Sequence, residues 1–312
     1  MRAVWTFWTK PFEARQRWAW RSRKHHLLAW VLSLGTARRH YPHTVLFTDD
    51  AGAQMLVDGL GLDFAEVRTD LNALDGDDPG WWALGKLHTY AAQTAPFVHL
   101  DNDVFLWNPL PASLAAAPLF AQNPEFFALG SGSWYRPEAF TAALDAVGGW
   151  LPEEWRWYLG VGGSGAVSCG LVGGHRTDFI RHYAELALAV VRHPANRPAW
   201  ARWGDKVDDN ILIEQYLLAA CLEYHRSVPH ARYREIDIRY LFPSVVEAFD
   251  EDAAARAGYT HLIGAAKRDR GLTNRLERRV AREYPDHYAR CLRYLGQASM
   301  GCDARTLVPA RE

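Results

Sequence analysis

Short apolar runs alternate with longer amphipathic stretches in the N-terminal part of the chain. Runs of this length, bounded by polar residues, Gly or Pro, predict buried strands at residues 3–7, 44–48, 64–67 and 97–101. The stretches between them predict helices at residues 13–38, 51–60 and 81–93. Strands that alternate with helices predict an α/β fold, a parallel sheet with helices on both faces.

The pattern is less regular in the second half of the chain. Strands are expected at residues 118–122, 259–263 and inside the glycine-rich passage 159–174. Helices are expected at residues 137–147, 177–192, 207–223 and 272–295. The simplest interpretation is one α/β domain followed by a helical extension.

Composition narrows the class of protein. The chain has 312 residues, a formal net charge of −1 and 49% apolar residues, which allows a full core and does not favour nucleic acid as a partner. Its four cysteines form no C-x-x-C pair, so they predict neither a zinc site nor a disulfide framework. The start lacks the pattern of a signal peptide, and apolar stretches such as 27–34 are too short for a membrane span. We therefore expect a cytoplasmic protein without a transmembrane segment.

Two aspartates stand at the end of the apolar run 97–101. Residues i and i+2 of a strand point the same way, so Asp101 and Asp103 converge if extended geometry continues through Asn102. Adjacent carboxylates repel each other unless a cation lies between them, and their oxygens suit Mg²⁺ or Mn²⁺. The alternative is a turn that ends the strand. Two further D-x-D sequences, at residues 75–77 and 250–252, are interpreted as turns or helix caps.

The segment K-L-H-T-Y-A-A-Q-T-A-P-F-V-H-L-D-N-D-V-F-L-W-N-P-L-P, residues 86–111, resembles the metal-binding segment of GT-A-fold glycosyltransferases. It is most similar to the glycogenin-like and galactosyltransferase families. The resemblance implies that Asp101 and Asp103 hold the metal and the ribose of a nucleotide-sugar. It also implies that Lys86 lies near the donor and that Asn102 belongs to the same binding segment.

A second segment, T-H-L-I-G-A-A-K at residues 260–267, is similar to the H-x-x-G-x-x-K segment of the same families. There the histidine is a third metal ligand, which here implies His261, and neutral imidazole is a good ligand for Mn²⁺. Gly264 would let the backbone approach a diphosphate, and Lys267 would bind it. The alternative for His261 is a histidine satisfied within the core. Arg268 and its neighbours replace the aromatic residues of the family.

Two weaker matches concern the sugar and acceptor side. Residues 167–174 look like the N-x-G-x-x-x-G strand that borders the sugar, with Ser168 and Cys169 in place of the usual polar pair. Asp208 and Asp209 open a helix at a place where such enzymes position an acid beside the reacting sugar. The competing interpretation is that both residues cap this helix.

Residues after the first strand would contact the nucleotide base in a GT-A fold. The resemblance therefore implies base contacts for Thr6, Trp8 and Thr9. A buried core position is the alternative for Trp8.

Taken as a whole, the resemblance implies a GT-A-like, Rossmann-type domain at residues 1–267 and a basic helical extension at residues 268–312. The implied activity is metal-dependent transfer of a sugar, with retention, from a nucleotide-sugar. Mn²⁺ or Mg²⁺ would be the cofactor and a UDP-sugar the donor. The acceptor stays open between a peptide, a lipid and a small metabolite.

Two other functions remain. H-L-D-N-D-V also fits the D-x-D-x-[TV] motif of haloacid-dehalogenase-like phosphohydrolases, in which Lys206 and the pair Asp208 and Asp209 would complete the site. That motif normally closes the first strand, whereas three strands precede it here. A GT-A-like protein that binds a nucleotide-sugar without catalysis is the other alternative.

Basic residues raise a separate question about surfaces. On the predicted C-terminal helix they stand three to four positions apart, at Arg275, Arg278, Arg279 and Arg282. Such a face is solvated and paired with Glu277 and Glu283, or it meets an acidic acceptor or a membrane surface. The Arg/Trp-rich stretch at residues 15–30 has the same two interpretations.

Overall fold

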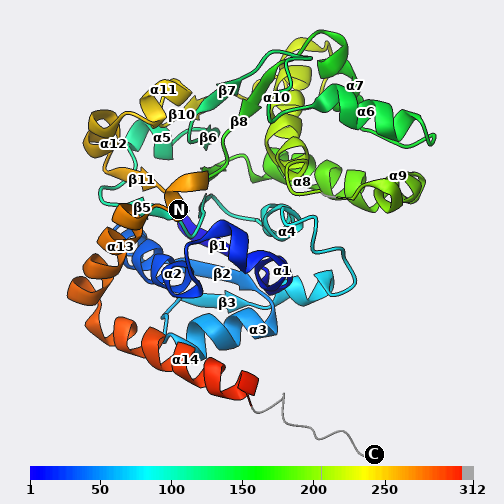
Figure 1. Ribbon diagram of the computed structural model, residues 1–312. Coiled ribbons are helices and arrows are strands. Elements are labelled where there is room, and N and C mark those ends of the chain that lie inside the picture. The colour runs from blue at the N-terminus through cyan, green and yellow to red at the C-terminus, as the bar shows by residue number, and fades with distance from the viewer. Residues whose placement is uncertain (205, 304–312) are drawn as a thin grey trace, which may run out of the picture.

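The fold is a mixed α/β arrangement around one large sheet (Figure 1). The structure is a computed structural model that describes residues 1–204 and 206–303, with the side chains of residues 15–18 and 298–303 excepted. The sheet has 7 strands in the order β10 (Ile238–Tyr240), β6 (Leu119–Ala121), β9 (Leu171–Gly174), β4 (Phe97–Leu100), β1 (Arg2–Phe7), β2 (Thr44–Thr48) and β3 (Glu66–Arg68).

The sheet is mostly parallel. β1 pairs in parallel with β2 and β4, β2 with β3, and β10 with β6. β9 runs antiparallel to both of its neighbours, β4 and β6, so the expected fully parallel sheet is wrong at this strand. The close approach depends on glycine, because a Cβ on Gly173 would lie 2.1 Å from the carbonyl oxygen of Phe97.

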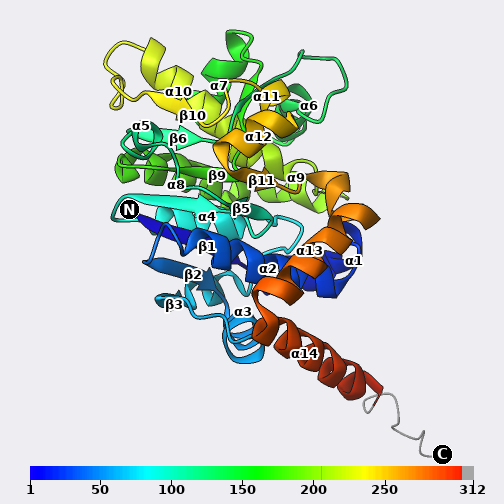
Figure 2. The ribbon, with the colours of Figure 1, turned by 90° about the vertical axis from the view of Figure 1, so that its left-hand side faces the viewer.

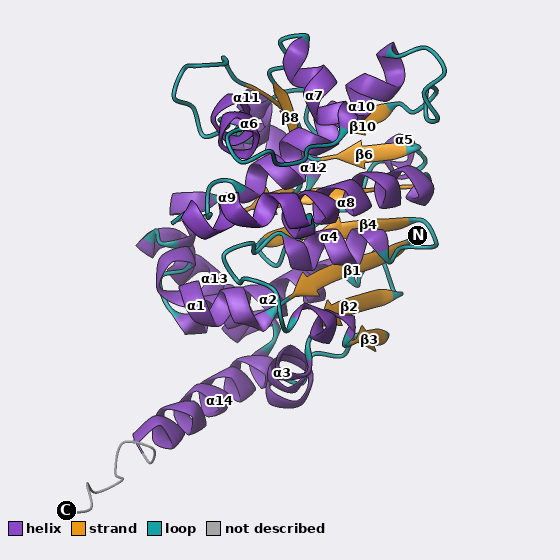
Figure 3. Ribbon diagram, turned by 90° about the vertical axis from the view of Figure 1, so that its right-hand side faces the viewer, coloured by secondary structure: helices purple, strands orange, loops and turns teal. Residues whose placement is uncertain are grey.

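Alternation along the strands divides the hydrophobic core between the two faces of the sheet. In β1, Val4 packs into the core on one face, and Ala3 and Trp5 pack into the core on the other. The first face is covered by α4 (Leu84–Ala91), α8 (Thr177–Arg192) and α10 (Leu217–Ser227); Figure 3 shows α4 and α8 in front of the strands. The second face is covered by α2 (Arg23–Ala37) and by helices from the C-terminal part. Helices therefore cover both faces, as the sequence pattern predicts.

Smaller elements complete the described chain. Two 2-stranded sheets pair β11 (Tyr259–His261) with β5 (Val104–Leu106) and β7 (Pro124–Phe126) with β8 (Gly165–Val167). The remaining helices are α1 (Thr9–Ala19), α3 (Asp50–Ala53), α5 (Ala112–Ala115), α6 (Pro137–Asp145), α7 (Glu153–Gly160), α9 (Arg197–Arg202), α11 (Val245–Ala248) and α12 (Glu251–Ala257). Short 3₁₀ or π segments are η1 (Gln54–Gly59), η2 (Asp70–Leu74), η3 (Pro194–Asn196), η4 (Leu212–Tyr216) and η5 (Gly264–Lys267).

Several predicted elements have different bounds. The helix expected at residues 13–38 is divided into α1 and α2, because Ser22 caps α2 by accepting a hydrogen bond from the backbone N–H of His25. The glycine-rich passage 159–174 carries both β8 and β9 rather than one strand. Asp250 caps α12, as expected for the third D-x-D sequence.

The C-terminal extension consists of α13 (Arg270–Glu283) and α14 (Pro285–Asp303). Both helices contact α2, and Figure 2 shows α13 beside it. Leu276, Val280 and Cys291 are buried in the core of the second sheet face. The proposed boundary at residue 267 therefore does not separate two hydrophobic cores, and residues 304–312 of the extension lie outside the described residues.

The predicted basic face is partly paired. Arg279 and Arg282 both form ion pairs with Glu283, and the Arg279 guanidinium lies 4.3 Å from the centre of the Trp107 ring. These contacts favour the interpretation of a solvated face for this part. In the Arg/Trp-rich stretch, the side chains of residues 15–18 lie outside the described residues. None of the helices in the described ranges is long and apolar enough to cross a membrane.

Candidate functional site

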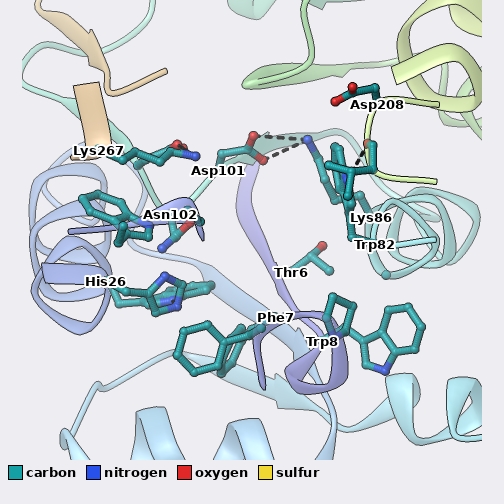
Figure 4. Close-up of a pocket in the computed structure, with 18 of the residues that line it drawn as sticks. Thr6, Phe7, Trp8, His26, Trp82, Lys86, Asp101, Asn102, Asp208 and Lys267 are labelled. Atoms are coloured by element: carbon teal, nitrogen blue, oxygen red, sulfur yellow. Dashed lines mark hydrogen bonds and ion pairs between the residues drawn. The ribbon is translucent and has the colours of Figure 1, made fainter. Parts of the chain in front are cut away.

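The candidate site lies where the order of the strands reverses. The chain runs from β1 to β2 and β3 on one side, and then returns to β4 on the other side of β1. In α/β sheets, ligands bind at the carboxyl ends of strands at such a switch point. A cavity of about 960 Å³ occupies this place, and residues that follow β1 and β4 line it (Figure 4).

Three potential metal ligands meet beside this cavity, of which Asp101 and Asp103 line it and His261 does not. Ligand atoms of Asp101, Asp103 and His261 all lie within 4.8 Å of one another. β11 runs antiparallel to β5 and places His261 opposite Val104, the residue after Asp103. The backbone N–H of Leu262 donates to the Asp103 carbonyl at 3.0 Å, which fixes this register.

The aspartates converge by a different local geometry from the one expected. β4 ends at Leu100, and the backbone N–H of Val104 donates to the Asp101 carbonyl at 3.0 Å, so residues 101–103 form a turn. Extended geometry therefore does not continue through Asn102. The turn still brings the two carboxylates together. The strand-terminal turn, which was the alternative interpretation, is therefore present together with the predicted pair of carboxylates.

The hydrogen bonds of His261 leave one ring nitrogen available. Nδ1 lies 2.8 Å from Gln122 Oε1, an oxygen that can only accept, so Nδ1 carries the proton. Nε2 then presents a lone pair 3.4 Å from Asp103 Oδ1, which is buried and has no hydrogen-bond partner. A divalent cation fits this donor set of carboxylate oxygens and an imidazole nitrogen held by a partner on its far side. Gly170 is needed beside the ring, because a Cβ there would lie 2.2 Å from it.

Each aspartate also has a lysine partner. Lys267 Nζ lies 2.5 Å from Asp103 Oδ2, and Lys86 Nζ lies 3.0 Å from Asp101 Oδ1. Burial alone would raise the pKa of Asp103, but the positive charge of Lys267 outweighs it and holds that pKa well below its usual range. Figure 4 shows Lys86 and Lys267 on either side of Asp101. The rim of the cavity therefore combines two potential metal ligands, Asp101 and Asp103, with two lysine side chains.

Glu214 is the main residue that the sequence analysis missed. It is fully buried on η4, and its carboxylate lies 2.5 Å from Lys86 Nζ. Burial raises the pKa of Glu214, and the Lys86 charge opposes that rise only in part. Burial likewise lowers the pKa of Lys86, but Asp101 and Glu214 together raise it above its usual value. The signal that could have indicated Glu214 is a lone acid inside the apolar run I-L-I-E-Q-Y.

Two of the three predicted base-contacting residues line the cavity. Thr6 does so, although its hydroxyl is already hydrogen-bonded to Thr89 and His99, and Trp8 lines it with a buried indole N–H that has no partner. Thr9 does not line the cavity. Its backbone N–H and its hydroxyl both donate to one oxygen of Asp49, so the structure gives Thr9 a structural role instead.

The two candidate acids separate in the structure. Asp208 is exposed and lines the cavity. Asp209 is 3% exposed, does not line the cavity and accepts a hydrogen bond from the Trp203 indole at 2.7 Å. The prediction of Asp209 as an acid facing the site is therefore corrected, because its carboxylate serves the fold.

The remaining predicted site residues come from three different segments of the chain. Gly264 has φ +52°, a conformation that favours glycine, and it begins η5, which carries Lys267. Asn102 lines the cavity, and its buried amide nitrogen has no partner. Neither Ser168 nor Cys169 lines the cavity, but the Cys169 carbonyl accepts a hydrogen bond from Lys86 at 3.2 Å.

Aromatic side chains form the other end of the cavity, below the charged groups in Figure 4. The His26 ring stacks on Phe12 with 4.3 Å between ring centres, and Phe7 and Trp20 contact the same ring. Burial and the nearby charge of Lys267 lower the pKa of His26 to about 3, so this ring is neutral. The cavity therefore joins a flat apolar part to a charged rim.

These features define a mixed α/β protein with a carboxylate–histidine–lysine cluster beside a cavity at the switch point of its sheet. The chain belongs to a protein family of unknown function, DUF6734, whose model matches residues 1–294. The match includes the whole cluster and most of the C-terminal extension. No curated protein sequence matches the chain significantly.

Proposed function

We propose that this protein is a metal-dependent glycosyltransferase with a GT-A-like fold that uses a nucleotide-sugar, in particular a UDP-sugar. The observation that carries the proposal is the meeting of Asp101, Asp103 and His261, residues far apart in the chain, within 4.8 Å. They meet beside a cavity whose two ends suit the two ends of a nucleotide diphosphate.

The charged rim fits a diphosphate and the aromatic end fits a base. Lys267 lies in the cavity wall next to Asp103 and is a positive group suited to phosphate oxygens. Phe7, Trp8 and Trp20 line the apolar part and offer flat surfaces to a pyrimidine ring. Asp208 also lines the cavity and is the remaining candidate for an acid near the sugar or the acceptor.

Sugar transfer from a nucleoside diphosphate builds negative charge on the leaving phosphate, and preorganised positive groups stabilise that charge. A Mn²⁺ or Mg²⁺ ion held by Asp101, Asp103 and His261 would supply Lewis-acid stabilisation of that leaving group. Lys267 would add a second positive group, and Glu214 would hold Lys86 against Asp101. Retention at the anomeric carbon and the class of acceptor remain parts of the proposal that rest on the family resemblance.

The test is a calorimetric titration of UDP into metal-stripped protein, with and without Mn²⁺. We expect Mn²⁺-dependent binding in the wild type and a loss of roughly 100-fold or more in Asp103→Asn, because a metal ligand is removed. Asp252→Asn is the matched control, since it changes the last residue of another D-x-D sequence, which lies exposed on α12.

Absence of UDP binding by the wild type, or binding that Mn²⁺ does not change, would overturn the proposal. Slow hydrolysis across a panel of UDP-sugars then separates a transferase from a protein that only binds the donor. An aryl phosphate assay with Mg²⁺ tests the phosphohydrolase alternative. No geometric observation favours that alternative, because Lys206 pairs with Asp78 at 2.9 Å and does not line the cavity.

A further inference from the structure

A second group of potential metal ligands lies away from this cavity. Glu154 on α7, His182 on α8 and His225 on α10 have ligand atoms within 4.8 Å of one another, and none of the three lines the cavity. Figure 1 shows these three helices gathered in the part of the molecule that β1, β2 and β3 do not reach. The sequence analysis missed the group because its members are far apart in the chain.

The three ligand atoms have the spacing of a metal site. Nε2 of His182 lies 3.0 Å from Glu154 Oε1 and 3.2 Å from His225 Nε2, and the third distance, between His225 Nε2 and Glu154 Oε1, is 3.8 Å. Ligands at Zn–N and Zn–O distances of about 2.0–2.1 Å around a tetrahedral ion lie about 3.3–3.4 Å apart. The observed triangle is close to one face of that tetrahedron.

Hydrogen bonds alone do not satisfy this triangle well. A ring nitrogen carries either one proton or one lone pair. With a proton, His182 Nε2 has to share it between Glu154 and His225. With a lone pair, it faces a carboxylate oxygen only 3.0 Å away.

A cation removes this conflict, because all three atoms then act as ligands through lone pairs. Ligation through Nε2 then places the proton of each neutral imidazole ring on Nδ1.

We propose that Glu154, His182 and His225 form a structural zinc site. Two imidazoles and one carboxylate are a donor set that suits Zn²⁺. The side chains of Glu154 and His225 are 10% and 6% exposed, whereas that of His182 is 27% exposed, so one side is open for a water as fourth ligand. The assignment of this site does not rest on the proposed transferase activity.

The position of the site suggests what the ion does. It joins α7, α8 and α10, which lie side by side on one face of the sheet. Tyr183, next to His182, donates a hydrogen bond to the backbone carbonyl of Glu214 at 2.5 Å. The ion therefore holds together the helices that position Glu214 against Lys86, and its removal weakens the packing between these helices.

The test measures zinc in the double variant Asp103→Asn/His261→Gln, in which the first cluster has lost two ligands. After dialysis against Zn²⁺, we expect about one ion per chain by mass spectrometry and a melting temperature that rises by several degrees. Adding His182→Gln or His225→Gln to this background should abolish both effects. His175→Gln is the matched control, because His175 is exposed and lies outside the group.

Co²⁺ gives a readout that does not depend on the stability of a histidine variant. The visible absorption of a four-coordinate Co²⁺ complex should appear in the background variant and be displaced by Zn²⁺. If the double variant binds no zinc and shows no such spectrum, the site does not exist. If His182→Gln and His225→Gln, folded by circular dichroism, keep the bound zinc, the ligands are misassigned. If either variant fails to fold, Glu154→Gln takes its place, and retained zinc and spectrum then overturn the assignment.

Discussion

At the residue scale, the candidate site is a chain of alternating charges. Glu214 contacts Lys86, Lys86 contacts Asp101, and Lys267 contacts Asp103. Buried charges are costly unless they are paired, and the Lys86 ammonium group compensates the buried carboxylate of Glu214. Glu214 therefore supports the site through its contact with Lys86, although it is not one of the three potential metal ligands.

A double-mutant cycle tests this chain. We expect Glu214→Gln and Lys86→Met each to lower the free energy of unfolding by roughly 2–4 kcal/mol, because each removes one partner of the buried Glu214–Lys86 ion pair. The double variant should lose less than the sum of the two, with a coupling energy on the order of 2 kcal/mol. Urea unfolding measures all three. Strictly additive losses would show that the two side chains do not stabilise each other.

The sequence analysis identified those residues of the candidate site that belong to short sequence motifs. Asp101, Asp103, His261 and Lys267 stand in two segments whose resemblance to a known family predicts that they lie together, and the structure brings them together. Glu214 could not be found in this way, since its role depends on Lys86, more than a hundred residues earlier in the chain. Thr9 and Asp209 were assigned to the site because they stand near a strand end and a helix start. That position does not show whether a side chain is already engaged in a hydrogen bond within the fold.

At the element scale, the C-terminal helices are fastened to α2 by a cluster around Glu277. Its carboxylate lies 2.6 Å from Lys24 Nζ and accepts a hydrogen bond from Tyr288 at 2.8 Å. It thereby joins α13, α2 and α14. Burial would raise the pKa of Glu277, but the contacts with Lys24 and Tyr288 outweigh it and lower the pKa.

This shift predicts a pH-dependent effect of Glu277→Gln. A lowered folded-state pKa stabilises the fold above the unfolded-state pKa, about 4.3 for a glutamate, and this stabilisation is lost as the pH falls through the folded-state value. We expect the variant to be less stable by about 1 kcal/mol at pH 7, since the pair is partly exposed. The difference should shrink below about pH 4.3. Thermal unfolding across this range measures it.

Glu185→Gln on α8 is the control for this effect, because Glu185 is exposed and forms no ion pair among the described contacts. A Glu277→Gln deficit that stays constant from pH 7 to acid would contradict the assigned role of the Glu277 charge.

At the scale of the whole molecule, the extension belongs to the same core as the sheet. Leu276, Val280 and Cys291 are at most 5% exposed and pack in the core that α2 shares with β1. Burying each aliphatic side chain stabilises a fold by about 1.5–3 kcal/mol. For Leu276 and Val280 together this amounts to about 3–6 kcal/mol, a large part of the total stability of an ordinary domain, about 5–15 kcal/mol.

We therefore expect truncation after residue 269 to abolish cooperative unfolding, even though both proposed metal sites precede that residue. Circular dichroism during heating measures this. The control is Leu292→Ala in the full chain, because Leu292 is 44% exposed on α14 and its truncation should change stability by less than about 0.5 kcal/mol. A truncated chain that melts cooperatively near the wild-type temperature would show that the extension is an independent addition.

The sequence by itself determined the α/β class, most of the strands around the site and the two motifs that meet there, because each is encoded by neighbouring residues. Only the tertiary structure decided the antiparallel direction of β9, the partners of Glu214 and the gathering of Glu154, His182 and His225. These features depend on which elements pack together. Local periodicity shows which face of an element is buried, but it does not show which other element covers that face.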